Sequence, residues 1–119
     1  MMKVLIVDDN HDVSELLSIF LKKKGFDNVI INDPKIALGH IKEEKYDAVV
    51  LDISMPEISG LDIIKKLERN KMLKDQKIII LSAASLTPRQ VDNLLKKEGI
   101  HDCLKKPVRL NELLTAISN

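Results

Sequence analysis

The stretch Val4-Leu5-Ile6-Val7-Asp8-Asp9 places four apolar residues directly before two acids. Apolar runs recur along the chain, and the others lie at residues 29–31, 48–51, 78–81 and, more weakly, 103–104. The first four runs are continuous and rich in β-branched side chains, which is typical of strands buried on both faces of a sheet. We therefore predict five short strands, one at each run.

Between and after these runs, apolar residues recur at helical spacing. The stretches with this spacing are residues 13–21, 36–41, 61–67, 91–95 and 110–117. The predicted cap signals at helix starts are Asp12 with Glu15, Asp33-Pro34 and Thr87-Pro88. Gly25 and Gly99 are expected to end the first and fourth helices.

Strands and helices thus alternate five times, the pattern of a (βα)5 chain. Alternation of this kind implies an α/β fold, a parallel sheet with helices on both faces. No repeat, low-complexity tract or flexible linker interrupts it, so we expect residues 1–119 to form one domain.

The composition limits the classes of function. Hydrophobic residues make up 45 % of the 119 residues, and the formal net charge is only +1, so no overall field favours nucleic acid or a membrane surface. No stretch approaches the roughly 20 apolar residues of a membrane span. The single cysteine, Cys103, excludes an internal disulfide and favours a reducing compartment. We expect a cytoplasmic protein that contacts neither nucleic acid nor membrane directly.

Polar residues follow the predicted strands where each one ends. Asp8 and Asp9 follow the first run, Asp52 ends the third, Ser82 ends the fourth, and Lys106 follows the fifth. In open parallel sheets, sites form at the carboxyl ends of the strands, near the point where strand order reverses. The sequence therefore predicts three carboxylates, a hydroxyl and an ammonium group at one edge of the sheet.

This set of groups suits phosphoryl chemistry. Clustered carboxylates repel one another unless a cation joins them, and Mg²⁺ prefers oxygen ligands of this kind. A carboxylate such as that of Asp52 can attack phosphorus to give an acyl phosphate. Lys106 and the metal would neutralise charge on the transferred group, and Ser82 can donate a hydrogen bond to it.

Four stretches together resemble one known family, the response-regulator receiver domains of two-component signalling. They are Leu5-Ile6-Val7-Asp8-Asp9, residues 49–56 (Val-Val-Leu-Asp-Ile-Ser-Met-Pro) with Gly60, Ile80-Leu81-Ser82-Ala83, and Lys106-Pro107. The resemblance covers essentially the whole chain. It implies a doubly wound, flavodoxin-like three-layer sandwich with the parallel sheet order 2-1-3-4-5.

The resemblance also implies a role for each residue. Asp52 would accept a phosphoryl group from a sensor histidine kinase or a histidine phosphotransfer protein, and partner binding would change. Mg²⁺, with Mn²⁺ as an alternative ion, would be held by Asp8, Asp9, Asp52 and the backbone carbonyl of Ser54. Ser82 would be the switch hydroxyl, and Lys106 would contact the phosphoryl group, aimed inward by a cis peptide bond before Pro107. The domain would catalyse only its own phosphorylation and dephosphorylation and would not be an enzyme for free substrates.

One position departs from the family pattern. The family usually has Tyr or Phe three residues before the lysine, and here the residue is Cys103. A thiol is too small for the aromatic side-chain swing that reports phosphorylation, so the readout is expected to depend on Ser82. In this family the fourth helix, fifth strand and fifth helix usually carry output to a downstream protein. The basic residues expected there are Arg89, Lys96, Lys97, Lys105 and Arg109, which favour a partner that is acidic at the contact.

Three other hypotheses share features with this one. A flavodoxin-like redox protein needs a phosphate-cradling loop after the first strand, where this chain has Asp8-Asp9-Asn10. A haloacid-dehalogenase-type phosphatase needs a second Asp two residues after the nucleophile, where this chain has Ser54. A degenerate receiver that acts as a phosphorylation-independent adaptor stays open because of Cys103. The absence of a trailing linker leads us to expect a stand-alone regulator, with an excised piece of a longer protein as the alternative.

Overall fold

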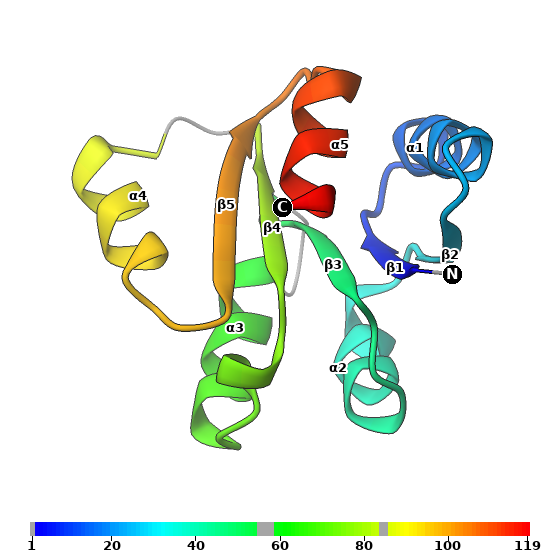
Figure 1. The fold of residues 1–119 in the computed structure, drawn as a ribbon. Helices are drawn as coiled ribbons and strands as arrows, with labels where there is room; N and C mark the ends of the chain where they lie inside the picture. The colour runs from blue at the N-terminus through cyan, green and yellow to red at the C-terminus, as the bar shows by residue number, and fades with distance from the viewer. Residues whose placement is uncertain (1, 55–58, 84–85) are drawn as a thin grey trace.

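The computed structural model describes residues 2–54, 59–83 and 86–119. Strands and helices alternate along the chain as predicted, with one short 3-10 helix, η1, before the fourth strand (Figure 1). The elements are β1 (Lys3–Val7), α1 (His11–Lys23), β2 (Asp27–Ile31), α2 (Pro34–Glu43), β3 (Ala48–Asp52), α3 (Gly60–Arg69), η1 (Leu73–Asp75), β4 (Ile78–Ser82), α4 (Pro88–Leu95), β5 (Ile100–Lys105) and α5 (Leu110–Ser118).

The five strands form one parallel sheet in the order β2-β1-β3-β4-β5, which confirms the predicted order. The chain first moves outward from β1 to β2, then crosses back and continues through β3, β4 and β5. The reversal lies between β1 and β3, whose carboxyl ends are therefore neighbours. In sheets of this type that position is where ligands bind.

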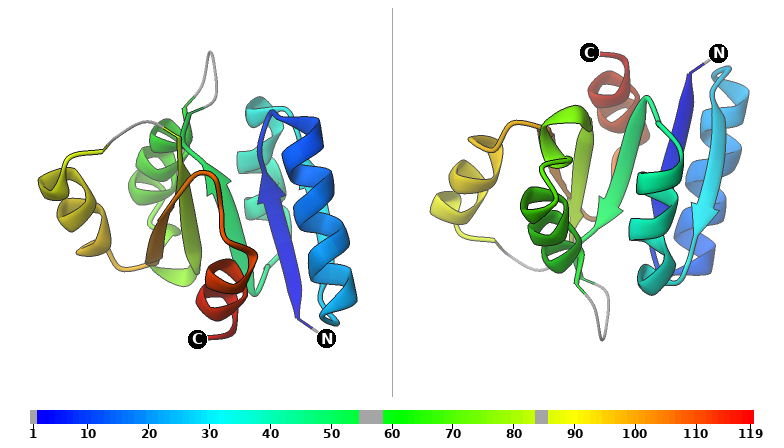
Figure 2. Two further views of the ribbon diagram at one scale, coloured as in Figure 1. Left: turned by 90° about the horizontal axis from the view of Figure 1, so that it is seen from above. Right: turned by 90° about the horizontal axis from the view of Figure 1, so that it is seen from below.

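Successive side chains of each strand point to opposite faces of the sheet and pack into two separate hydrophobic cores. Val4 and Ile6 of β1 pack with residues of α1 and α5. Leu5 and Val7 pack on the other side, against residues of α2, α3 and α4. Figure 2 shows the resulting three layers from two directions. Apart from the partly exposed Lys3 at the start of β1, every residue of the three central strands is buried, so polar and apolar residues do not alternate along them.

Burial on both faces is only partial for β2, where Val29 packs against one core and Ile30 against the other. Ile31 is its only fully buried residue, because β2 lies at the edge of the sheet and has one neighbouring strand. Three apolar residues placed on helix faces are also exposed: Leu16 by 56 %, Ile36 by 50 % and Leu95 by 42 %. Hydrophobic spacing marks a face of a helix, but the packed neighbours decide how much of that face is covered. Throughout the described ranges, each helix is too short or too polar to span a lipid bilayer.

The predicted cap of the first helix was wrong. Asn10 is the cap, and its Oδ1 accepts a hydrogen bond from the backbone N–H of Val13 at 3.1 Å. The helix starts at His11, so Asp12 lies inside the first turn, where an acid still interacts favourably with the helix dipole. The caps predicted for α2 and α4 are confirmed, at Asp33 and Thr87.

Glycine is required at two turns by backbone geometry. Gly25 follows α1 with φ +89°, in the left-handed region that glycine tolerates best, and so ends that helix as predicted. The helix α4, however, already ends at Leu95, and Gly99 instead forms the turn into β5 with φ +104°. A Cβ atom there would lie 1.9 Å from the carbonyl oxygen of Leu73, so the turn packs directly on η1.

Candidate functional site

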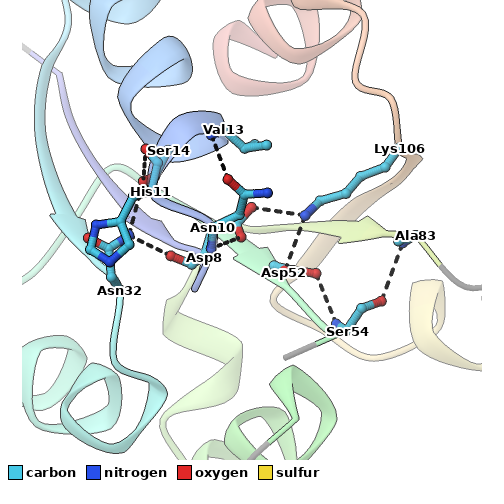
Figure 3. Close-up of polar contacts among 10 residues, drawn as sticks. All are labelled: Asp8, Asn10, His11, Val13, Ser14, Asn32, Asp52, Ser54, Ala83 and Lys106. Atoms are coloured by element: carbon cyan, nitrogen blue, oxygen red, sulfur yellow. Dashed lines mark hydrogen bonds and ion pairs between the residues drawn. The ribbon is translucent and has the colours of Figure 1, made fainter. Parts of the chain in front are cut away.

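Three carboxylates, those of Asp8, Asp9 and Asp52, meet at the carboxyl ends of β1 and β3. Figure 3 shows two of them, Asp8 and Asp52. Asp8 directly follows β1 and is 0 % exposed, and Asp52 is the last residue of β3 and is 2 % exposed. Asp9 is partly exposed beside them, and each of the three acids offers a carboxylate oxygen within 4.8 Å of those of the others. The strand-end prediction therefore holds for these three residues, since the structure brings all of them together.

Lys106 bridges the two buried acids. Its Nζ lies 3.0 Å from Oδ2 of Asp8 and 3.1 Å from Oδ2 of Asp52, and its side chain is 18 % exposed. Its backbone N–H donates to the carbonyl oxygen of Ser82, which fixes the loop after β5 to the end of β4. The peptide bond between Lys106 and Pro107 is cis, as the resemblance implied. Lys105 is exposed, so only the second of the two lysines enters the site.

The electrostatics of the site follow from burial. Burial raises the pKa of Asp8 above its ordinary value, and the hydrogen bonds from the Asn10 backbone and from Lys106 offset this only in part. Burial alone would lower the pKa of Lys106, but the carboxylates of Asp8 and Asp52 outweigh it and raise that pKa. Lys106 is therefore held as a cation between two acids that would otherwise repel each other.

A hydrogen-bond network holds the backbone of Asp8 in place. Asn32, directly after β2, donates through Nδ2 to the carbonyl oxygen of Asp8 at 2.7 Å and to Oγ of Ser14 at 3.0 Å. The buried Ser14 donates in turn to the carbonyl oxygen of His11. Sequence reasoning missed Asn32 and Ser14. The position of Asn32, a polar residue at the carboxyl end of a strand, was the available signal.

Two serines lie near Asp52 on the side of β4, away from Asp8 and β1. The backbone N–H of Ser54 donates to Oδ1 of Asp52 at 2.9 Å, and Oγ of Ser54 accepts from the backbone N–H of Ala83 at 3.3 Å. Ser82 is the last residue of β4 and is 3 % exposed. Since β3 and β4 are neighbours, with Asp52 opposite Leu81, Ser82 lies at the same edge of the sheet as the acids. Met55 and Pro56, part of the stretch that carries the resemblance, lie outside the described residues.

The donor set fits a hard divalent cation. Carboxylate oxygens of Asp8, Asp9 and Asp52 lie close enough to one another to share one ion. Oxygen ligands and retained waters are what Mg²⁺ prefers, and partly exposed Asp9 leaves a side of the site open to water. Among the residues that the structure describes, no other group of His, Cys, Asp or Glu side chains is arranged to hold a metal.

Cys103 lies on β5 and is partly buried against the core beneath α2, α3 and α4. Burial, with a smaller effect of the neighbouring Asp102, raises the pKa of its thiol, so it carries little of the reactive thiolate. This supports a packing role and not a redox role.

The basic residues predicted for an output surface spread along α4, β5 and the start of α5. Arg89 lies in the first turn of α4 and Lys96 follows its end, while Lys105 ends β5 and Arg109 precedes α5; all four are exposed. Lys97 differs, because its Nζ lies 2.6 Å from Oε2 of Glu68 on α3, which offsets its charge.

An apolar groove lies beside the site. It has a volume of about 430 Å³ and is lined on one side by Val13, Leu16 and Leu17 of α1. Lys106 and Pro107 line the opposite side, so the groove shares a residue with the acidic cluster. The exposed side chain of Leu16 is thus part of a surface that leads to Asp52.

Known proteins resemble this chain over nearly its full length. The DNA-binding response regulator MtrA of Mycolicibacterium paratuberculosis is 33 % identical over 97 % of this chain and 49 % of its own length. The CpxR homolog of Haemophilus influenzae, a transcriptional regulatory protein, is 34 % identical over 98 % of the chain and 49 % of its own length. The chain thus spans about half the length of these curated relatives. Our expectation of no direct nucleic-acid contact concerns residues 1–119 alone and stays a prediction.

Solved structures show the same fold. The receiver domain of the Francisella response regulator 1452 superposes with a TM-score of 0.87, at 30 % identity, over 99 % of this chain and 94 % of that one. Response regulator TrrA of Thermotoga maritima, solved in complex with Mg²⁺-BeF, superposes with a TM-score of 0.83, at 30 % identity, over 99 % and 97 % of the two chains. The response regulator receiver domain family matches residues 4–118, and the chain belongs to that family.

Proposed function

We propose that this chain is a phosphorylation-switched signalling domain in which Asp52 accepts a phosphoryl group from phosphohistidine. The donor would be a sensor histidine kinase or a histidine phosphotransfer protein. The observation that carries the proposal is the placement of Lys106 between two buried carboxylates, 3.1 Å from Asp52 and 3.0 Å from Asp8. Phosphoryl transfer requires a nucleophile held in position with positive charge beside it. Here the nucleophile is the buried Asp52, the cation is Lys106, and the partly exposed Asp9 leaves the site open to solvent on one side.

In the transfer step, a carboxylate oxygen of Asp52 forms a bond to phosphorus while the bond from phosphorus to the donor nitrogen breaks. The leaving imidazole nitrogen keeps the electron pair of the broken bond and takes a proton from water. Lys106 neutralises charge on the phosphoryl oxygens, and the backbone N–H of Ser54 holds Asp52 in position. Ser82 is the candidate hydroxyl donor to the phosphoryl group. Later attack of water on phosphorus would return Asp52 to its free state.

Asp8, Asp9 and Asp52, with the backbone carbonyl of Ser54, are the proposed ligands for Mg²⁺. When bound, the metal supplies positive charge that offsets both the nucleophile and the incoming phosphoryl group. A cytoplasmic location, favoured by the lone Cys103, is part of the same proposal.

The donor protein must reach Asp52 from outside, and the groove beside α1 borders the site through Lys106. We propose that an apolar helix of the donor occupies this groove. Leu16→Glu should then slow transfer from a phosphorylated histidine phosphotransfer protein, while labelling by acetyl phosphate stays as in the wild type. Ile36→Glu is the matched control, since Ile36 is exposed to a similar degree on α2, away from the groove.

Output is proposed to pass through α4, β5 and α5 to a downstream protein that is acidic at the contact. Arg109 is exposed and Lys97 is paired with Glu68, so Arg109→Glu should weaken partner binding more than Lys97→Glu.

The deciding experiment is incubation with acetyl phosphate and Mg²⁺, followed by measurement of the intact protein mass. One added phosphoryl group is expected on the wild type, and none is expected on Asp52→Asn or in the presence of EDTA. No added mass on the wild type would favour the adaptor hypothesis that Cys103 leaves open. Labelling that EDTA does not change would contradict the metal role.

A further inference from the structure

The side chain of Ser54 connects two loops at the edge of the site. Its Oγ accepts a hydrogen bond from the backbone N–H of Ala83, 29 residues further along the chain, with N and O 3.3 Å apart. Its own backbone N–H donates to Oδ1 of Asp52 at 2.9 Å. Figure 3 shows the two bonds in succession between Asp52 and Ala83. They form a continuous path from the carboxylate of Asp52 to the start of the β4–α4 loop.

The Ala83 bond is the weaker link in this path. Hydrogen bonds from N–H to oxygen are usually 2.7–3.2 Å long, so the bond at 3.3 Å is a long one. Its acceptor is a neutral hydroxyl. A phosphoryl group on Asp52 would bring anionic oxygens to the same pocket edge, and charge-assisted hydrogen bonds are roughly twice as strong as neutral ones. The Ala83 N–H would then have a better acceptor than Ser54.

We infer that the Ser54 hydroxyl is a latch. It holds the Ala83 N–H in the unphosphorylated protein and releases it to the phosphoryl group once Asp52 is phosphorylated. This inference rests on the proposed function. It gives the side chain of Ser54 a positioning role that is separate from the role proposed for its backbone carbonyl. Release of the latch frees the beginning of the loop that leads to α4.

The latch also answers a question raised by Cys103. An aromatic ring at that position usually reports phosphorylation in this family, and the half-buried thiol cannot do so. A contact at the start of the β4–α4 loop can act without a ring, because it responds directly to the charge on Asp52. Ser54 itself is exposed, and an ordinary exposed loop serine would have no effect on ligand affinity.

The test uses beryllium fluoride with Mg²⁺ as the phosphoryl mimic, on the full chain labelled with ¹⁵N. The variants are Ser54→Ala, which removes the hydroxyl, and Ser54→Thr, which keeps it. Ser54→Ala should shift the amide resonance of Ala83 in the ligand-free protein. It should also raise the affinity for beryllium fluoride by about two- to tenfold, the value of one net hydrogen bond that no longer has to be broken. Ser54→Thr should keep the wild-type resonance and affinity.

Equal affinity of the wild type and Ser54→Ala, with an unchanged Ala83 resonance, would overturn the latch and leave the proposed function intact. A wild type that binds no beryllium fluoride in the presence of Mg²⁺ would overturn the proposed function, and the latch with it. Weaker binding by Ser54→Ala would also contradict the inference, because it would mean that the hydroxyl helps the ligand directly. Resonances outside the site report whether each variant is folded.

Discussion

The Nζ of Lys106 lies 3.1 Å from Oδ2 of Asp52, although 54 residues separate them in the sequence. The same atom lies 3.0 Å from Asp8, so one cation serves two buried carboxylates that come from two neighbouring strands. The arrangement keeps the buried carboxylate of Asp52 beside a positive charge. The consequences of this relationship can be measured.

Lys106→Ala should reduce the rate of Asp52 labelling by acetyl phosphate about 100-fold, the usual loss when one preorganised charge or donor is removed from a transition state. The matched control is Lys105→Ala, because Lys105 is adjacent in sequence but exposed. The measurement is the initial rate of mass increase at saturating Mg²⁺. Equal rates for the two variants would show that Lys106 has no part in the transfer.

Stability without metal should depend on pH through Asp8. Burial raises the pKa of Asp8 in the folded protein above the unfolded value of about 3.9, so the folded protein binds more protons between these two pKa values. The stabilisation is therefore fully present below the unfolded pKa and is lost as pH rises through the folded pKa. Asp8→Asn removes this dependence, so its free energy of unfolding relative to the wild type should increase as pH rises.

The measurement is urea unfolding in EDTA between about pH 3 and about pH 8, a range that begins below the ordinary pKa of an aspartate. Asp92→Asn is the control, because Asp92 is an exposed acid on α4. A constant difference between the wild type and Asp8→Asn over this range would contradict the prediction.

Gly60→Ala should disturb the end of β3. A Cβ atom on Gly60 would lie 2.7 Å from the carbonyl oxygen of Asp52 and 2.8 Å from the side chain of Ile53, so α3 must move away. We expect a loss of about 1–3 kcal/mol in the free energy of unfolding, as for other overpacked sites, together with slower labelling of Asp52.

Gly39→Ala is the matched control for that substitution. Gly39 lies within α2, and a Cβ atom there meets nothing within 4 Å. Alanine in the interior of a helix should stabilise the protein by about 0.5–1 kcal/mol and leave labelling unchanged. Both variants are compared by urea unfolding, and a stable Gly60→Ala would show that α3 adjusts without cost.

Asn10→Ala should cost about 1 kcal/mol of stability, because it removes the side chain that caps α1. Asp12→Ala should cost less, since Asp12 contributes only a favourable charge in the first turn. Thermal unfolding at neutral pH compares the two variants. A larger loss of stability for Asp12→Ala than for Asn10→Ala would show that Asp12, and not Asn10, caps α1.

The sequence by itself determined the order of strands and helices and the chemistry at the strand ends. Runs such as Val4–Val7 and Ile78–Leu81 are uniformly apolar, which is typical of strands that are covered on both faces. Because parallel strands all end at one edge, the positions of Asp8, Asp52 and Lys106 along the chain were enough to predict that they meet. These signals are local, and each can be read within a few residues.

Only the tertiary structure decided which partners each polar group takes. Asn32 supports Asp8 from a different strand, and Ser54 joins Ala83 across two loops. The exposure of Leu16 and the edge position of β2 likewise depend on what lies next to them in space. The physical reason is that hydrogen bonds and burial are properties of pairs of groups, and for these residues the second member of the pair comes from a distant part of the chain.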